Sequence, residues 1–319
     1  MHHHKSVVVV SVVVLASAAM LALKSVTAYA TAPQSRAEAP AFFRLMLGDY
    51  EVTVLWDGTA AREMDRIMSK PAVVRGLYMR DHQALPVAMS LNTFLINTGS
   101  KLVLIDSGGG RFVGERAGRL IANLRASGYQ PEQVDAVLLT HMHPDHFGGL
   151  VDEGRRTFPN ALIYVNKRDL DYWLSAAAEE MPARQTMSQQ AHAAVGPYAA
   201  AGVLRPFDGV TALFPGIRAL PAPGHTVGHT TYMIESRGKQ LLLWGDIIHS
   251  AETQFLDPQI AIQFDMNVDD AIAARERLLA DAARNGYIVG SAHITFPGLG
   301  HVSSDGQVYS WVQLPYAAP

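Results

Sequence analysis

The sequence predicts an α/β (α+β) fold in which two packed mixed sheets are flanked by helices. Short apolar runs with strand character come in two batches along the chain, and helical spacing occurs between and after them. Apolar residues at 49% and charged residues at 17% indicate a globular chain with a sizeable core. No internal repeat and no linker divides the body, so residues 31–319 are predicted to form one domain.

The predicted elements follow one another along this body. Alternation of polar and apolar residues predicts a strand at Tyr50–Leu55, and Thr98-Gly99-Ser100 is typical of a hairpin turn between two strands. Apolar residues at helical intervals predict a helix at Arg116–Ser127 and another at Asp269–Arg284. The other predicted strands are Thr93–Asn97, Lys101–Ile105, Val134–Thr140, Leu162–Val165, Arg218–Pro221, Thr231–Ile234, Gln240–Trp244 and Tyr287–Ser291.

The first thirty residues have the pattern of an export signal. Met1–Lys5 is short and basic, Ser6–Leu23 is almost wholly apolar, and Ala28–Ala30 supplies a small-x-small cleavage site. We therefore expect residues 1–30 to be a signal peptide and the mature protein to be periplasmic or secreted, with no stable membrane association. Retention of the apolar run as an anchor is the alternative, because about 17 residues can span a bilayer.

Charge and cysteine content exclude several classes of protein. Removal of residues 1–30, which hold two lysines and no acid, takes the formal net charge from −3 to −5. A mildly acidic body argues against nucleic-acid binding, including a tRNA-processing nuclease, because such proteins need a basic face. The chain has no cysteine, so it has no disulfide framework and no thiolate to act as nucleophile or metal ligand.

Four metal-ligating side chains follow the predicted strand Val134–Thr140 within six residues. They are His141, His143, Asp145 and His146. Their spacing does not follow one face of a helix, and Pro144, Gly148 and Gly149 suit a tight loop that brings them together. Imidazole and carboxylate ligands without thiolate favour zinc or a similar first-row ion.

Three later strands end in further ligand types. His225, Asp246 and His293 each come directly after a short apolar run. An acid or an imidazole at the end of a buried strand costs free energy unless it is solvated or paired. A shared metal centre explains all three, so we predict a site for two divalent metal ions. Zn²⁺ is the favoured ion, and Co²⁺, Mn²⁺ and Fe²⁺ stay open because His/Asp sites bind them with similar affinity.

The pattern His-x-His-x-Asp-His-x-Gly-Gly, followed by Gly-His-Thr, Gly-Asp and a late His, resembles the metallo-β-lactamase superfamily. This resemblance implies an αβ/βα sandwich with a dinuclear metal site at one sheet edge. The stretches 43–49, 128–135 and 296–301 further resemble the methyl parathion hydrolase family and its exported lactonase relatives. The likeness runs from about Phe42 to Pro315. Such relatives are often homodimers, which makes a homodimer an expectation here.

The resemblance assigns roles to individual residues. It implies one metal held by His141, His143 and His225, and a second held by Asp145, His146 and His293, with Asp246 bridging both. His301 competes for the last position, and we prefer His293 because it directly ends its strand. His229 is expected to orient the loop of His225, and Asp106 to hydrogen-bond a ligand imidazole.

Two cations about 3.5–4 Å apart lower the pKa of a shared water, so a bridging hydroxide exists near neutral pH. Such a hydroxide would attack a carbonyl carbon or a phosphorus, and Asp145 or Asp246 would relay a proton to the leaving group. The absence of cysteine excludes the β-lactamase subclasses with a cysteine ligand. The subclass without cysteine has no bridging acid, so Asp246 counts against it.

Five residues bear on the choice of substrate. Trp173 matches an aromatic residue that lines the pocket in the methyl parathion hydrolase branch, with core packing as the alternative. His249 stands where the triester-cleaving relatives carry an aliphatic residue, Ile262 and Phe264 are bulkier than that activity favours, and Ile67 replaces a basic residue at the pocket mouth. We therefore expect a lactonase or arylesterase acting on a small molecule, with organophosphate triester hydrolysis as a side activity.

Three other functions stay open at this point. The first is a dedicated organophosphorus hydrolase of the methyl parathion type. The second is a glyoxalase II-like thioesterase, which shares all seven ligands, although an export leader and an acidic body argue against a cytosolic thioester. The third is a module that sequesters zinc without catalysis.

Overall fold

The structure is a computed structural model, and it describes Gln34 and residues 39–316. The predicted signal peptide lies outside the described residues. All the strands and helices belong to one compact unit, Pro40–Pro319. Within the described part of the chain, no helix combines the length and the apolar character needed to cross a membrane.

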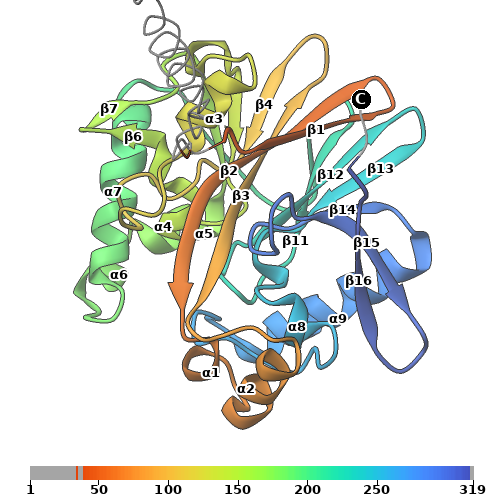
Figure 1. The fold of residues 1–319 in the computed structure, drawn as a ribbon. Helices are drawn as coiled ribbons and strands as arrows, with labels where there is room; N and C mark the ends of the chain where they lie inside the picture. Colours follow the sequence, from red (N-terminus) through yellow and green to blue (C-terminus); the bar gives the residue numbers. More distant parts are fainter. Residues whose placement is uncertain (1–33, 35–38, 317–319) are drawn as a thin grey trace, which may run out of the picture. The chain divides into compact units, whose positions relative to one another are not determined.

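Seven strands form the first sheet, in the order β1-β2-β3-β4-β5-β8-β9 (Figure 1). The pairs from β1 to β4 are antiparallel, and the pairs from β4 to β9 are parallel. The strands are β1 (Phe42–Leu47), β2 (Tyr50–Arg62), β3 (Val87–Asn97), β4 (Leu102–Ile105), β5 (Ala136–Leu138), β8 (Leu162–Asn166) and β9 (Leu204–Phe207). β6 (Val151–Asp152) and β7 (Arg155–Arg156) form a separate hairpin.

Seven more strands form the second sheet, in the order β10-β11-β12-β13-β14-β15-β16. Only β13 and β14 pair in parallel among these strands, and the other pairs are antiparallel. The strands are β10 (Thr211–Phe214), β11 (Ile217–Pro221), β12 (Thr230–Ser236), β13 (Lys239–Leu243), β14 (Ile288–Gly290), β15 (Leu299–Ser304) and β16 (Tyr309–Gln313).

Helices fill the connections between these strands. The α-helices are α1 (Met64–Ile67), α2 (Pro71–Arg80), α3 (Leu120–Ala126), α4 (Pro144–Phe147), α5 (Lys167–Trp173), α6 (Ala176–Glu180), α7 (Gln185–Ala200), α8 (Ala251–Gln254) and α9 (Val268–Asn285). Three short 3-10 helices complete the set at Pro131–Gln133, Gly148–Leu150 and Gly245–Ile247.

Apolar side chains pack in three layers, and this confirms the predicted sandwich. Between the sheets, β2 and β3 contribute Val54 and Ile96, and the second sheet contributes Tyr232 and Leu243. A second layer joins the outer face of the first sheet to α3 and α7, and a third joins the second sheet to α9. Figure 1 shows α7 and α9 on opposite sides of the two sheets. The order of layers is therefore αβ/βα.

The predicted helix at Arg116–Ser127 begins too early. The structure starts α3 at Leu120, because Gly118 has a φ of +82°, which a right-handed helix cannot contain. The carboxylate of Asp57 accepts hydrogen bonds from the backbone N–H groups of Gly118 at 3.2 Å and Leu120 at 2.9 Å. These bonds hold the segment before the helix as a loop.

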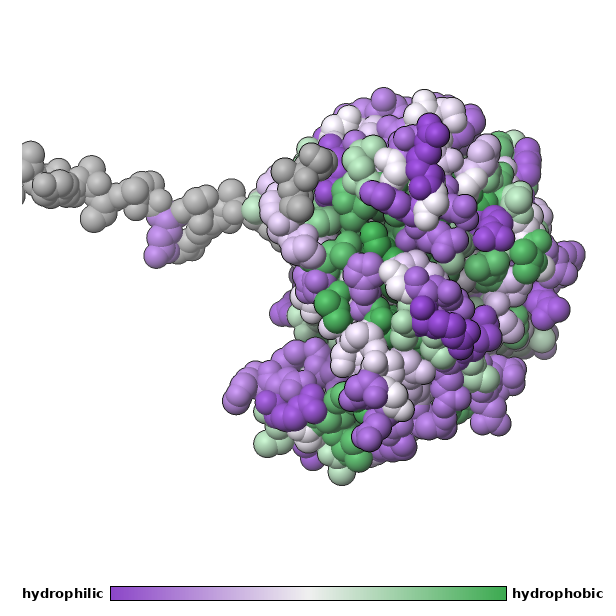
Figure 2. All heavy atoms as spheres, turned by 90° about the vertical axis from the view of Figure 1, so that its right-hand side faces the viewer, coloured by the Kyte–Doolittle hydropathy of each residue, from purple (hydrophilic) through white to green (hydrophobic). Residues whose placement is uncertain are grey.

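The face seen in Figure 2 is mostly hydrophilic, and the apolar side chains on it form separate small areas. Large apolar side chains that are exposed in the described part of the chain are scattered over different elements. Val73 and Met79 lie on α2, Met46 on β1 and Val312 on β16.

The start of α9 lies beside the loop of His225 and provides a test of the fold. The Asn267 side chain accepts a hydrogen bond from the Asp270 backbone N–H at 3.2 Å, and the Asn267 backbone N–H donates to the Gly224 carbonyl at 2.9 Å. We expect Asn267→Ala to lower the free energy of unfolding by about 1 kcal/mol, because one N–H at the helix start loses its acceptor. Asn267→Ser keeps an acceptor and should retain most of the stability. Equal losses for the two variants in denaturant titrations would contradict this role.

Candidate metal centre

The loop after β5 carries the first four predicted ligands, and glycines allow it to pack tightly. Pro144 begins the one-turn helix α4, so the chain turns directly after His143. A Cβ on Gly148 would lie 2.1 Å from the carbonyl oxygen of Gly109, and one on Gly149 would lie 1.9 Å from that of Ser107. The pair Gly148-Gly149 is therefore required for the loop to lie against the segment that follows β4.

The structure brings the seven predicted ligands together from both sheets. Ligand atoms of His141, His143, His225 and Asp246 all lie within 4.8 Å of one another, and so do those of Asp145, His146 and His293. The ligands in the segment 141–146 follow β5, whereas His225, Asp246 and His293 follow β11, β13 and β14. Strand ends at one edge of the sandwich thus supply the whole cluster.

Asp246 is at the centre of the cluster. Its Oδ2 lies 3.1 Å from His293 Nε2 and 3.2 Å from His225 Nε2, and its Oδ1 lies 3.1 Å from His146 Nε2. His141 Nε2 is 3.7 Å from Oδ2. One carboxylate therefore faces imidazoles of both predicted metal positions, as a bridging ligand must.

The donor atoms of this cluster fit a cation. His143 Nδ1 lies 3.1 Å from His141 Nε2 and 3.0 Å from His225 Nε2, so nitrogen atoms face nitrogen atoms. His146 Nε2 and Asp246 Oδ1 are buried and lie 3.1 Å apart, but neither makes a hydrogen bond of good geometry. A buried polar atom without a partner costs free energy, and a divalent ion among these lone pairs would supply the missing partner.

The electrostatics of the cluster shift the pKa values of its histidines in opposite directions. Burial lowers the pKa of His141 and His143 well below the usual histidine value, so these imidazoles are neutral. Burial opposes the charge on Asp246, but His146 and His293 outweigh it and hold the pKa of Asp246 well below its usual range. Burial also disfavours charge on His146, yet Asp246 and Asp106 raise its pKa well above the usual value. The carboxylates thus attract positive charge to the centre.

Outer hydrogen bonds orient three of the imidazoles. His146 Nδ1 lies 2.8 Å from the Asp106 carboxylate, His225 Nδ1 lies 2.9 Å from that of Asp265, and His293 Nδ1 lies 3.0 Å from the Ser90 carbonyl. With its proton on Nδ1, each ring turns the Nε2 lone pair towards the cluster. The expectation that Asp106 hydrogen-bonds a ligand imidazole is confirmed.

Asp169 on α5 holds two of the ligand loops together, and the sequence analysis missed it. Its carboxylate accepts hydrogen bonds from Met142 N–H at 2.9 Å, Thr226 Oγ1 at 2.7 Å and Gly228 N–H at 2.6 Å. Met142 lies between two predicted ligands, and Thr226 follows a third. Burial raises the pKa of Asp169 to about 6, against the lowering effect of these bonds. Its partners lie 27 to 59 residues away along the chain, so no local sequence pattern marked it.

The other two histidines near the site have distinct places. His229 Nε2 accepts a hydrogen bond from the backbone N–H of Asp246 at 3.1 Å, so it supports the central carboxylate. It lies in the loop that follows His225. His301 lies on β15 with its Nδ1 3.2 Å from the Tyr287 carbonyl, away from the cluster, whereas His293 lies within it.

The predicted substrate-pocket residues fall into two groups. His249 lies inside the metal cluster, with its Nε2 3.1 Å from Asp246 Oδ2, and its ligand atom lies within 4.8 Å of those of Asp246 and His293. Trp173 is 1% exposed, and its ring centroid lies 5.6 Å from that of His143. Ile67, Ile262 and Phe264 pack together in a cluster with α1 and α2.

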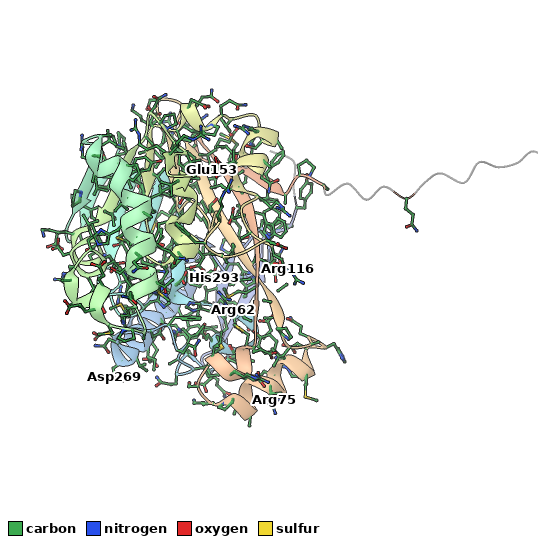
Figure 3. All side chains as sticks on the ribbon, turned by 90° about the vertical axis from the view of Figure 1, so that its left-hand side faces the viewer. Arg62, Arg75, Arg116, Glu153, Asp269 and His293 are labelled. Atoms are coloured by element: carbon green, nitrogen blue, oxygen red, sulfur yellow. The ribbon has the colours of Figure 1, made fainter. Side chains whose placement is uncertain are left out.

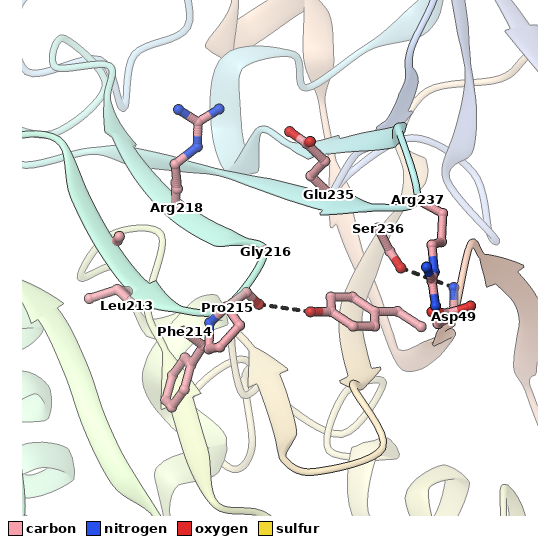
Figure 4. Close-up of a pocket in the computed structure, with 11 residues that line it drawn as sticks. Asp49, Leu213, Phe214, Pro215, Gly216, Arg218, Glu235, Ser236 and Arg237 are labelled. Atoms are coloured by element: carbon pink, nitrogen blue, oxygen red, sulfur yellow. Dashed lines mark hydrogen bonds and ion pairs between the residues drawn. The ribbon is translucent and has the colours of Figure 1, made fainter.

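A separate hollow of 820 Å³ lies among β10, β11 and the β1–β2 turn (Figure 4). Its main polar groups already have partners. Tyr50 Oη donates to the Pro215 carbonyl at 2.9 Å, and Ser236 Oγ accepts from Asp49 N–H at 2.9 Å. It contains none of the His/Asp groups that could hold a metal ion in the described residues. We therefore assign no chemistry to this hollow.

An αβ/βα sandwich with a His/Asp cluster at one edge defines a class of metal-dependent hydrolases. The family model for the metallo-beta-lactamase superfamily matches residues 88–293, and the chain belongs to that superfamily. The match begins in β3 and ends at His293, so it spans all seven clustered residues.

Comparison with solved structures and curated relatives agrees with this membership. The crystal structure of the hydrolase AbOPH is 32% identical, with a TM-score of 0.84 over 88% of this chain and 100% of that chain. AidC, described as a dizinc quorum-quenching lactonase in complex with a product, is 27% identical, with a TM-score of 0.78 over 87% and 99%. A "probable metallo-hydrolase" of Mycobacterium tuberculosis is 26% identical over 65% of this chain and 72% of its own length.

The central carboxylate gives the first test of the metal centre. We expect Asp246→Ala, loaded with zinc and desalted, to retain one ion or none where the unaltered protein retains about two, because both positions lose a shared ligand. Asp305→Ala removes an exposed acid from a distant turn and should retain metal normally. Elemental analysis with a check of folding by circular dichroism decides, and full retention by Asp246→Ala would contradict the bridging role.

Asp169 gives a second test. In Asp169→Asn, the amide NH₂ replaces one acceptor and faces backbone N–H groups, so we expect zinc affinity to fall about 10- to 100-fold. Asp171→Asn changes an exposed carboxylate on the same helix and serves as the matched control. Competition with a chromophoric chelator measures the affinity. If folded Asp169→Asn binds zinc as tightly as the control, Asp169 does not organise the site.

Proposed function

We propose that this metallo-hydrolase opens lactones and cleaves aryl esters with two bound divalent metal ions, and hydrolyses organophosphate triesters as a side activity. The observation that carries the proposal is the buried cluster of five histidines and two aspartates with a further histidine, His249, against its centre. The description of AidC as a lactonase supports the same class of substrate.

The proposed ligand sets follow the two groups of clustered side chains. His141, His143 and His225 would hold one ion, Asp145, His146 and His293 would hold the other, and Asp246 would bridge them. Paired divalent ions lower the pKa of water and withdraw electron density from a carbonyl or phosphoryl oxygen. The chain has no cysteine, and we favour zinc with this donor set of imidazoles and carboxylates.

Asp145 is the carboxylate placed to meet the substrate. Its side chain is 16% exposed, against 4% for Asp246, and its Oδ2 lies 3.7 Å from His293 Nε2. A group that carries a proton to a leaving alkoxide must reach both the cluster and the bound molecule. We therefore assign this role to Asp145 and a purely organising role to Asp246.

In this proposal, His249 makes the site more suitable for lactones and aryl esters than for phosphotriesters. Its ring stacks on that of His293, with centroids 5.3 Å apart, and its Nδ1 is buried without a hydrogen-bond partner. A polar, hydrogen-bonding wall suits the planar carbonyl of a lactone or aryl ester better than the alkoxy groups of a phosphotriester. A dedicated organophosphorus hydrolase is the alternative, and activity confined to triesters would favour it.

Two expectations from the sequence stay predictions. Export of the chain depends on residues 1–30, which lie outside the described residues, and the expected homodimer depends on a second copy of the chain. Neither is needed for the chemistry proposed here, because one chain supplies every proposed ligand.

A direct comparison of substrates tests the proposed function. On one zinc-loaded preparation, we expect kcat/KM for dihydrocoumarin to exceed that for methyl parathion by about 100-fold or more, a few kcal/mol of differential transition-state binding. Asp246→Ala should lose both activities, which excludes a contaminating hydrolase. A preference for methyl parathion would overturn the proposal, and a preference for a glutathione thioester would favour the thioesterase alternative. No turnover of any of them would favour a zinc-sequestering module.

A further inference from the structure

Arg62, the last residue of β2, is a half-buried cation without an anionic partner among the described residues. Its Nε is buried and makes no hydrogen bond. Its Nη1 reaches only the carbonyl of the adjacent Ala61, at 3.4 Å. Asp65, three residues further on, pairs with Arg75 through its Oδ2, at 2.6 Å, and not with Arg62. A charge held partly out of water without a partner is costly, so this position favours an anion from outside the chain.

Two contacts place Arg62 beside the proposed substrate site. Its guanidinium lies over the ring of Phe264, 5.9 Å from the centroid, and the next residue, Asp265, holds His225. On the adjacent strand, Arg62 pairs with Val87, which lines a small cavity of 40 Å³ together with His249 and His293. Figure 3 labels Arg62 between His293 and Arg75 of α2.

We propose that Arg62 binds a carboxylate on the substrate, and that the site selects lactones or aryl esters with a negative charge away from the reacting carbonyl. This inference rests on the proposed function and names its substrate class more closely. The planar guanidinium offers paired N–H donors that match a carboxylate. The apolar surroundings provided by Phe264 and Val87 strengthen such a pair relative to one in water.

The charge of the whole protein does not itself attract such substrates. The formal net charge is −3, so the protein as a whole repels an anion. Arg66, on α1, is an exposed arginine close to Arg62 in sequence and serves as the matched control. If a preference for anionic substrates came from the overall charge, loss of Arg62 and loss of Arg66 would reduce it equally.

The test compares two aryl esters with the same leaving group, mono-4-nitrophenyl adipate and 4-nitrophenyl hexanoate. We expect the zinc-loaded protein to prefer the adipate by about 10- to 100-fold in kcat/KM, the range of one charge-assisted contact. In Arg62→Met, which keeps an apolar stem over Phe264, the adipate-to-hexanoate ratio should fall to about one, mainly through KM. Arg62→Lys should keep part of the ratio, and Arg66→Met should keep all of it.

A binding measurement separates failure of this inference from failure of the proposed function. Calorimetric titration with the uncleaved amide N-(4-nitrophenyl)adipamic acid should show binding about 10-fold or more tighter to the unaltered protein than to Arg62→Met. That result supports the carboxylate site even if neither ester is hydrolysed, in which case the proposed function alone fails. Equal affinities, an adipate-to-hexanoate ratio near one in the unaltered protein, or an equal loss in Arg66→Met would overturn the inference.

Discussion

The structure depends on one buried carboxylate surrounded by imidazoles. Asp246 is 3% exposed and lies within 3.2 Å of nitrogen atoms from His146, His225 and His293. Taking this charge out of water is unfavourable, and only positive charge at the centre compensates for it. The surrounding loops have to stay close together for that compensation to persist. The close approach of these loops is therefore needed both for the metal centre and for the local fold.

Other buried carboxylates hold the loops around this centre. Asp57 fixes the loop before α3, Asp106 joins the ends of β4 and β5, and Asp169 joins the loops of His143 and His225. Asp265 connects His225 to the buried guanidinium of Arg275, 3.7 Å away. Each carboxylate accepts from backbone N–H groups or from charged partners, so each is hydrogen-bonded despite burial. The rigidity of the site comes from these acids as much as from the apolar core.

The sequence predicted the sandwich and the strands that end at the site, because a short apolar run followed by His or Asp is a local pattern. It did not predict the helices α2, α5, α6 or α7, because the contacts of their apolar residues form only in the folded chain. Asp169 and Asp265 were missed for the same reason, since their partners lie 27 to 59 and 40 residues away. His249 was expected in the substrate pocket and lies against Asp246 itself. Whether an imidazole binds substrate or supports a carboxylate depends on distances between side chains in the folded protein. The spacing of residues along the sequence does not give these distances.

The division of the cluster between the two sheets also constrains how the protein is made. His141 to His146 follow β5, but Asp246 and His293 come about 100 and 150 residues later, after β13 and β14. A chain emerging from the ribosome could thus complete the first sheet while holding half of a metal site. With the ligands assigned as proposed, neither metal position is complete until the second sheet has docked on the first. Metal loading would then mark the completion of the tertiary structure, and an arrested chain would present histidines without the carboxylate that gives them their affinity.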